Sequence, residues 1–183
     1  MKRILLILLL MFPFLSFAKE EVKLEKCIDG DTFKGITDKE ITIRLLAVDT
    51  PELDKNGETE FYAIEASNYT CKLLENANKI EIEYDPKSDK KDKYDRTLAW
   101  VYVDNYLLND ALVRNGYAKV KYVYDDYKYV DILKEHESLA KKEKLGIWND
   151  SHIEDVALWT SIFIAILLSL VALLKNKLNK IKK

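Results

Sequence analysis

The chain has few of the residues that bind zinc or form several disulfides: its 183 residues include two cysteines and two histidines. Cys27 and Cys71 have no other Cys or His at the spacing of a zinc site, and His136 and His152 also lack such partners. A zinc site of this kind is therefore excluded. Pairing of the two cysteines stays open, because one is expected in a strand and the other in a helix, and a disulfide needs Cα atoms within about 7 Å.

Positive charge is also scarce between residues 19 and 155. All 31 acidic residues lie in this region, whereas seven of the 29 basic residues lie outside it, which leaves 22 basic residues and a formal charge of −9. Proteins that only bind nucleic acid depend mainly on Lys and Arg to neutralise phosphates. The composition argues against that class, while a catalyst needs only a local positive site and a metal.

The N-terminus has the features of a secretory signal peptide over residues 1–18. Two basic residues precede an apolar run, and residues 16–18 (Ser-Phe-Ala) have the small-x-small pattern of a cleavage site. An uncleaved anchor is the alternative, although Pro13 interrupts the run, which is short for a membrane span. We expect this segment to be removed from the mature chain.

The C-terminal region predicts a transmembrane helix over residues 156–174. This run of nineteen residues has no charge, and as a helix it would be about 28 Å long, close to the thickness of the hydrocarbon core. A buried core helix is the alternative, but the run has no polar face. Lysines follow it and acidic residues precede it, so the positive-inside rule predicts a cytoplasmic tail (175–183), with the linker (151–155) and the domain (19–150) outside.

One α+β domain is expected over residues 19–150. Short apolar or alternating segments separated by turn signals predict five strands, at 22–28, 32–36, 41–46, 80–84 and 97–103. Helical spacing predicts three helices, at 61–76, 108–115 and 128–144. This order fits a five-stranded OB-fold barrel with helices on it, although periodicity alone leaves the type of barrel open.

Two aspartates at the ends of predicted strands are candidate metal ligands. Asp31 follows the Asp29-Gly30 turn at the start of the second strand, and Asp49 follows the third strand. The ends of adjacent strands lie close together, so both carboxylates and the Thr50 carbonyl could bind one cation. Oxygen ligands suit Ca²⁺, or less well Mg²⁺. A role as a turn former is the alternative for either aspartate alone.

Glu52 and Arg44 could supply the remaining chemistry of phosphodiester hydrolysis. Pro51 has a fixed φ and would hold the Glu52 carboxylate just beyond the strand, where it could orient or deprotonate a water molecule. The Arg44 guanidinium could bind a phosphate bidentately and stabilise charge in the transition state. A surface salt bridge is the alternative for Arg44.

These residues together resemble the staphylococcal nuclease (thermonuclease) family. The resemblance extends from about residue 22 to residue 148, and its motifs are residues 28–32, 44–52, 65–67, 92–94 with Arg96, 109–124 and 141–148. It implies an OB barrel with three helices. It also implies calcium-dependent hydrolysis of DNA and RNA with little sequence preference, leaving 3′-phosphate ends; the alternative is a non-catalytic module that binds nucleic acid or protein.

The resemblance implies roles for ten residues in three groups: Ca²⁺ ligands (Asp31, Asp49 and the Thr50 carbonyl), catalytic residues (Arg44, Glu52 and Arg96), and substrate-binding residues (Lys93, Tyr94, Tyr122 and Tyr124). Glu52 would activate the water, and the two arginines would bind the scissile phosphate. Arg96 would also assist the leaving 5′ oxygen. Lys93 and Tyr94 would contact a neighbouring phosphate, whereas Tyr122 and Tyr124 would stack on bases of any sequence. Packing is the alternative for Tyr122 and Tyr124, and a solvated surface charge is the alternative for Lys93.

Three departures from the family pattern are visible in the sequence. The turn between Asp31 and Arg44 and the loop between Glu52 and the first helix are each one residue short, which surface loops tolerate easily. The loop after Glu52 is less basic than in the family pattern, which predicts weaker binding of long polyanions. Asp95 stands where the family usually has glycine; aspartate can adopt the left-handed conformation at some cost, but its charge could compete with phosphate for Arg96.

Overall fold

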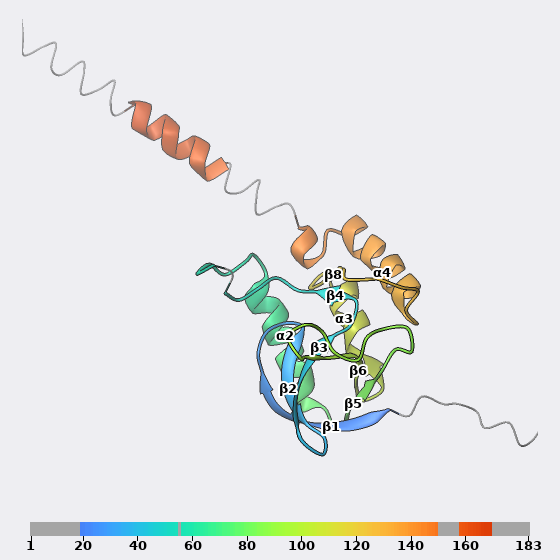
Figure 1. Cartoon of the computed structure of the whole chain (residues 1–183). Helices are drawn as coiled ribbons and strands as arrows, with labels where there is room; N and C mark the ends of the chain where they lie inside the picture. Colours follow the sequence, from blue (N-terminus) through green and yellow to red (C-terminus); the bar gives the residue numbers. More distant parts are fainter. Residues whose placement is uncertain (1–18, 55, 150–157, 170–183) are drawn as a thin grey trace, which may run out of the picture. The chain divides into compact units, whose positions relative to one another are not determined.

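The computed structural model describes residues 19–54, 56–149 and 158–169, and the chain divides into two compact units after Ile147. The strands of the first unit are β1 (Glu20–Cys27), β2 (Thr32–Ile36), β3 (Glu40–Leu45), β4 (Val48–Asp49), β5 (Ile80–Glu83), β6 (Thr97–Val103), β7 (Tyr106–Leu107) and β8 (Lys119–Val120). The helices are α2 (Ala63–Asn76), α3 (Leu108–Arg114), α4 (Val130–Lys142) and the 3₁₀ helix η1 (Gly146–Trp148) (Figure 1).

The five longer strands close into a barrel. β1 pairs antiparallel with β2 and β5, β2 pairs with β3, and β5 pairs with β6. A parallel pairing of β3 with β6, with Arg44 opposite Leu98, closes the barrel. The prediction of an α+β fold built on a five-stranded barrel is therefore confirmed, and every predicted strand is present within two residues of its expected bounds.

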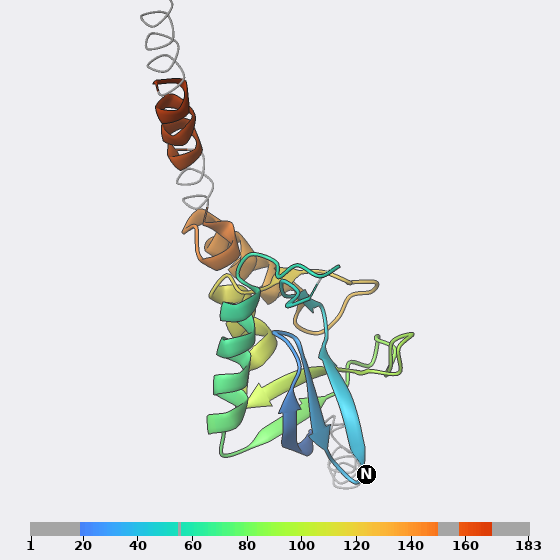
Figure 2. The same ribbon diagram turned by 90° about the vertical axis from the view of Figure 1, so that its left-hand side faces the viewer.

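A two-stranded ladder outside the barrel brings two distant loops together. β4 pairs antiparallel with β8, with Val48 opposite Val120. As a result, the loop of residues 50–62 and the loop of residues 121–129 lie at the same end of the domain (Figure 2). The loop of residues 85–95 projects from the barrel between β5 and β6. These three loops carry most of the candidate site residues.

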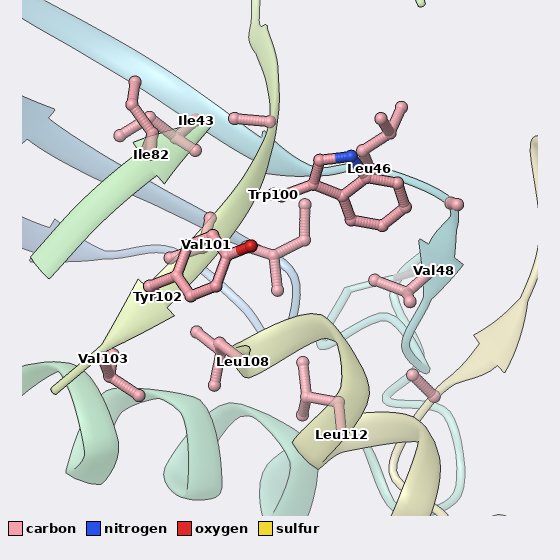
Figure 3. Close-up of a cluster of buried hydrophobic side chains, with 14 of the residues drawn as sticks. Ile43, Leu46, Val48, Ile82, Trp100, Val101, Tyr102, Val103, Leu108 and Leu112 are labelled. Atoms are coloured by element: carbon pink, nitrogen blue, oxygen red, sulfur yellow. The ribbon is translucent and has the colours of Figure 1, made fainter. Parts of the chain in front are cut away.

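The core lies between the barrel strands and α3. Strand β6 is buried along almost its whole length because it pairs with β5 on one side and β3 on the other, and α3 covers it (Figure 3). Trp100 is fully buried on this strand, and its indole N–H donates to Asp85 at 3.0 Å, so the one polar atom of the side chain is satisfied. Leu108 and Leu112 of α3 are fully buried in the same cluster.

The prediction of three helices is wrong by one. The expected helices correspond to α2, α3 and α4, and within the described residues up to 149 η1 is a fourth helical segment, which the sequence did not predict. Gly146 has a φ of 51°, which turns the chain after α4, and the Ile147 N–H donates to the Gly116 carbonyl at 2.8 Å. This hydrogen bond joins residues 31 positions apart, so the local sequence does not signal the extra helical turn.

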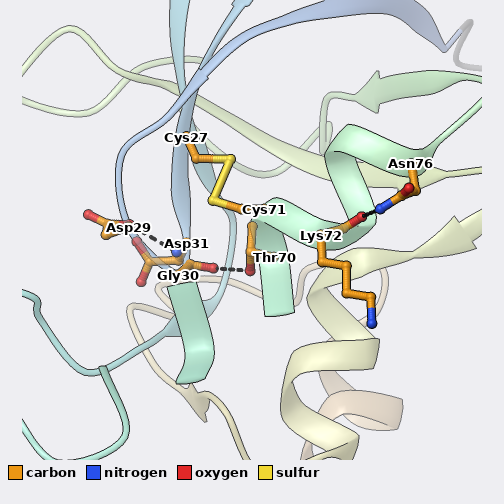
Figure 4. Close-up of a disulfide and its surroundings, with 8 residues drawn as sticks. All are labelled: Cys27, Asp29, Gly30, Asp31, Thr70, Cys71, Lys72 and Asn76. Atoms are coloured by element: carbon orange, nitrogen blue, oxygen red, sulfur yellow. Dashed lines mark hydrogen bonds between the residues drawn. A yellow bond between two sulfur atoms is a disulfide. The ribbon is translucent and has the colours of Figure 1, made fainter. Parts of the chain in front are cut away.

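The two cysteines form a disulfide that attaches α2 to the end of β1 (Figure 4). The Cα atoms of Cys27 and Cys71 are 5.8 Å apart. The pairing that the sequence left open is therefore made, because α2 crosses the barrel where β1 ends. Cys27 lies three residues before Gly30, which directly precedes Asp31, the first candidate metal ligand.

In the second unit the structure describes a helix over residues 158–169. Within the described ranges, no helix combines the length and the apolar character that crossing a bilayer requires. The span predicted at 156–174 lies partly outside these ranges, and the signal peptide (1–18), the linker (151–155) and the tail (175–183) lie wholly outside them.

Candidate active site

Arg44 is the centre of the site, at the end of β3 and almost fully buried. One terminal nitrogen, Nη1, donates to the carbonyls of Leu45 and Val48 at 2.9 and 2.8 Å. The other, Nη2, lies 3.0 Å from a carboxylate oxygen of Asp31 and 3.3 Å from one of Asp49. The backbone thus holds the guanidinium, and the guanidinium brings the two aspartates together.

Asp31 is buried directly before β2 and its carboxylate is well supplied with donors. The Thr50 N–H donates to Oδ2 at 2.9 Å and the Thr32 hydroxyl donates to Oδ1 at 3.0 Å. Burial raises the pKa of Asp31 to about 6, because these bonds and the Arg44 charge only partly offset the loss of hydration. A buried carboxylate short of compensating positive charge is chemically suited to a cation.

The turn that carries Asp31 is fixed by a glycine and a buried hydrogen bond. A Cβ atom on Gly30 would lie 2.7 Å from Oγ1 of Thr50, so only glycine fits beside that side chain. The Thr70 hydroxyl on α2 donates to the Gly30 carbonyl at 2.6 Å, next to the disulfide (Figure 4). The structure therefore holds the Asp31 turn from both sides.

Glu52 stands in the exposed loop that follows β4. Partial burial raises its pKa first, and the charges of Asp31 and Asp49 raise it further. Its backbone N–H donates to the Glu60 carboxylate at 2.9 Å, and the Glu60 N–H donates back to the Glu52 carbonyl at 3.0 Å. The two bonds fix the start of the loop, and the raised pKa brings Glu52 nearer to the range of an effective general base.

Arg96 is held by Asp92, a partner that the sequence analysis did not weigh. Its Nε and Nη2 lie 2.7 and 2.6 Å from the same Asp92 oxygen. Burial raises the pKa of Asp92, but its bonds from the Arg96 side chain, the Arg96 N–H and the Tyr94 N–H lower it by more, so the net shift is downward. Asp95 has a φ of 64°, the left-handed conformation expected for it, and it pairs with Lys91 rather than with Arg96.

The predicted substrate-binding residues lie at the mouth of the site. Tyr94 and Tyr124 expose 67% and 83% of their surfaces, which leaves their rings open to a ligand. Tyr122 is less exposed, has a φ of 59°, and lies with its ring centroid 5.8 Å from the Arg44 guanidinium. The Lys93 ammonium lies 4.9 Å from the Tyr94 ring centroid.

One cavity of about 630 Å³ joins these groups. The predicted residues that line it are Arg44, Asp49, Glu52, Lys93, Tyr94, Arg96, Tyr122 and Tyr124. Thr50 instead lines a second cavity of about 320 Å³. Asp31 lies beneath the site as a partner of Arg44. The fold thus brings the predicted residues to one place, although their roles stay predictions.

A second residue that sequence reasoning missed is Lys121, after β8. Its ammonium lies 2.8 Å from Oδ2 of Asp49, and this hydrogen bond raises the pKa of Lys121. Its place directly before Tyr122, in a segment already singled out, was the available signal. Asp92 could have been found from its spacing of four residues from Arg96.

The donors at this site fit a hard cation. In the described parts of the chain, no three Asp, Glu, His or Cys side chains are arranged as a metal-binding group. However, Asp31 and Asp49 place carboxylate oxygens within 3.3 Å of one Arg44 nitrogen, and the Thr50 backbone is bonded to Asp31. Two carboxylates supplemented by a carbonyl and waters are the oxygen ligands that Ca²⁺ takes.

Comparison with known proteins agrees with this geometry. Residues 42–150 match the model of the family described as "Staphylococcal nuclease homologue". The chain is 44% identical over 133 residues to endonuclease YncB of Bacillus subtilis, a match that covers 71% of this chain and 62% of that protein. It is 42% identical over 132 residues to the SPbeta prophage-derived endonuclease YokF of the same species, covering 70% and 44%.

The chain thus spans less than two thirds of these two relatives. It covers more of a third, the thermonuclease of Staphylococcus hyicus, to which it is 37% identical over 139 residues, or 74% of this chain and 80% of that protein. The family resemblance expected from the motifs is therefore confirmed. The chain belongs to the family of staphylococcal nuclease homologues.

Proposed function

We propose that this chain is a calcium-dependent endonuclease that hydrolyses the phosphodiester bonds of DNA and RNA with little sequence preference and leaves 3′-phosphate ends. The observation that carries the proposal is the convergence of Asp31 and Asp49 on Arg44, with Glu52 and Arg96 on the same cavity. The names of the relatives, two endonucleases and a thermonuclease, support hydrolase activity on nucleic acid.

In this mechanism Glu52 takes a proton from a water molecule, or orients it, as the water oxygen forms a bond to phosphorus. The bond from phosphorus to the 5′ oxygen breaks, and that oxygen takes a proton from solvent as it leaves. Arg44 is already fixed by two carbonyls and donates to the phosphate oxygens as negative charge grows. Asp31, Asp49 and the Thr50 carbonyl would hold Ca²⁺, which supplies Lewis-acid polarisation of the phosphate when bound.

Arg96 must exchange partners in order to act. Its guanidinium is bonded to Asp92, but it lines the cavity and about a third of the side chain is exposed. Because the pair is partly buried, a phosphate that replaces Asp92 must offer Arg96 charge-assisted hydrogen bonds of similar strength. Arg96 would then bind the scissile phosphate and assist the leaving 5′ oxygen. The exposed rings of Tyr122 and Tyr124 suit stacking on any base, in keeping with low sequence preference, while Lys93 and Tyr94 would contact a neighbouring phosphate.

We further propose that the enzyme acts outside the cytoplasm, anchored by a single helix over residues 156–174 after removal of residues 1–18. The sequence supports this through the uncharged run and the lysines that follow it. The disulfide is consistent with an oxidising compartment. Two tests apply: after alkaline extraction the full chain should stay with the membrane fraction, and protease added to intact cells should remove the nuclease domain.

The test of activity is digestion of single-stranded DNA by the full chain in mild detergent, with calcium or with chelator. We expect calcium-dependent cleavage that falls by about 10²–10⁴-fold in Glu52→Gln, as loss of a general base requires. Glu58→Gln makes the same change of charge in the same exposed loop and should retain activity. If the wild-type chain does not cleave, the domain is a non-catalytic binding module instead. Equal activity of Glu52→Gln would refute the role of Glu52.

A further inference from the structure

Lys121 lies against Asp49, one of the candidate metal ligands; its backbone is held by a hydrogen bond, and its side chain is half exposed. The Lys121 N–H donates to the Ala47 carbonyl at 3.1 Å, directly after the β4–β8 ladder. Its ammonium lies 2.8 Å from Asp49 and 4.8 Å from the ring centroid of Tyr122. Half of the side chain, 51%, is exposed to solvent. The backbone of Lys121 is therefore rigid while its ammonium can change partners.

The cavity next to this lysine adjoins the larger cavity that Arg96 lines. It measures about 320 Å³ and is lined by Asp49, Thr50, Glu52, Asp54, Asn56, Glu60, Lys121 and Tyr122. It shares Asp49, Glu52 and Tyr122 with the larger cavity. A polynucleotide that places one phosphate between Arg44 and Arg96 would therefore place the next in one of the two cavities.

This smaller cavity is otherwise acidic. Four carboxylates line it, and Lys121 is its one positively charged side chain among the residues that the structure describes there. Phosphodiester groups carry negative charge, so Asp54 and Glu60 would repel a strand that crosses this wall. A strand can cross with least cost beside the lysine.

We propose that Lys121 is a substrate-binding residue that contacts the phosphodiester group next to the one cleaved, in the smaller cavity. This inference rests on the proposed nuclease function. In the structure the ammonium neutralises Asp49; when Asp49 binds the cation, that neutralisation is no longer needed and the four-carbon side chain is free to reach the phosphate. Lys121 thus competes with the cation for Asp49 before substrate binds, and contacts the substrate phosphate afterwards.

The test compares Lys121→Gln and Lys121→Arg with wild type, all as the full chain in mild detergent with calcium. Lys34→Gln is the matched control, because Lys34 is also a half-exposed lysine paired with one carboxylate, Glu40, but on the β2–β3 hairpin. The substrates are a single-stranded decanucleotide and a dinucleotide with one phosphodiester group. We expect Lys121→Gln to raise KM for the decanucleotide about tenfold, the scale of one charge-assisted contact, with kcat within about twofold.

The dinucleotide has no neighbouring phosphate, so its KM should stay unchanged in Lys121→Gln. Lys121→Arg should restore most of the affinity for the decanucleotide. Loss of one phosphate contact should also reduce the salt dependence of decanucleotide binding by about 0.7 in the slope of log K against log salt. An unchanged KM for the decanucleotide, or an equal rise for both substrates, would overturn the proposal.

Calcium affinity, measured by calorimetry without nucleic acid, gives a readout of opposite sign. Because the cation must displace Lys121 from Asp49, Lys121→Gln should bind calcium about two- to fivefold more tightly, the scale expected for one partly exposed ion pair. Weaker calcium binding would indicate a purely structural lysine. If wild type fails to cleave, the proposed function is overturned. Decanucleotide binding, followed by fluorescence anisotropy, still tests Lys121: the Glu52→Gln chain that also carries Lys121→Gln should bind more weakly than the chain with Glu52→Gln alone.

Discussion

The disulfide between Cys27 and Cys71 closes a loop of 44 residues and ties α2 to the turn that carries Asp31. In the chain-entropy account, a loop of this length restricts the unfolded chain by about 4 kcal/mol at 25 °C, and measured values are commonly about 2–4 kcal/mol. Since domains of this size are stable by about 5–15 kcal/mol, the bond accounts for a substantial part of the total. Reduction should therefore lower stability without preventing folding.

Urea unfolding followed by tryptophan fluorescence measures this contribution, because Trp100 is buried in the core. With an m-value of about 2 kcal/mol/M, the loss of 2–4 kcal/mol shifts the midpoint by about 1–2 M. Wild type with reductant and the double variant Cys27→Ser/Cys71→Ser without it should show the same shift. Thr70→Val removes the hydrogen bond to Gly30 but keeps the disulfide. It should lower the free energy of unfolding by only about 1 kcal/mol and therefore shift the midpoint less.

Reductant must have no effect on the double variant, which has no disulfide to reduce. If thiol titration shows that wild-type cysteines are fully reduced and the midpoint does not move, the loop is already restricted by other contacts and the entropic argument is wrong.

Three further perturbations test the site. Asp92→Asn should cost about 1–2 kcal/mol at pH 7, because it loses bonds to Arg96 and to the loop. The folded pKa of Asp92 is lowered, so its contribution is fully present above the unfolded value of 3.8 and declines below it, until it is lost as pH falls through the folded pKa. In urea unfolding, a cost of Asp92→Asn at pH 3 equal to that at pH 7 would contradict this. Gly30→Ala should cost about 1–3 kcal/mol, because its Cβ would meet the Thr50 side chain at under 3 Å, and an unchanged melting temperature would show that the turn can move. Calcium at about 100 times its Kd should stabilise the fold by about 2.7 kcal/mol, and this gain should be absent in Asp31→Asn if Asp31 is a ligand.

The barrel was predictable because its strands carry local signals. The segments 32–36 and 97–103 match β2 and β6 at both ends, since each is bounded by turn residues and rich in β-branched or aromatic side chains. In contrast, the two-residue strands β4 and β8 have no periodic pattern to detect. Their pairing joins residues about 70 positions apart in the sequence, as Val48 and Val120 show, so no local pattern signals it.

Helix ends were missed where a distant contact decides them. The last helix was expected from residue 128, but the Lys128 N–H donates to Asp85 at 2.8 Å and its ammonium pairs with Glu83, so α4 begins at Val130. The first helix was expected from residue 61, but Tyr62 has a φ of 67°, outside the helical region, and α2 begins at Ala63. Neither contact nor strain is visible in a single sequence.

The candidate site was predictable as a set of residue types but not as a set of partners. Three of its cations are paired with carboxylates: Arg44 with Asp31 and Asp49, Lys121 with Asp49, and Arg96 with Asp92. Sequence motifs identify which groups a reaction needs, whereas these pairings depend on loops that meet only in the folded chain.

The pairings have a consequence for how metal and substrate bind. When a cation binds the Asp49 carboxylate, Arg44 and Lys121 both lose it as a partner. The positive charge of these two side chains is then less neutralised, and they attract phosphate more strongly. A phosphate that engages the same side chains leaves Asp49 in need of a cation. Because coupling between two ligands is reciprocal, calcium should tighten oligonucleotide binding by the same factor by which the oligonucleotide tightens calcium binding. Residues 19–155 have a formal charge of −9, and this exchange of partners is what allows a local positive site to form where the overall charge opposes nucleic acid.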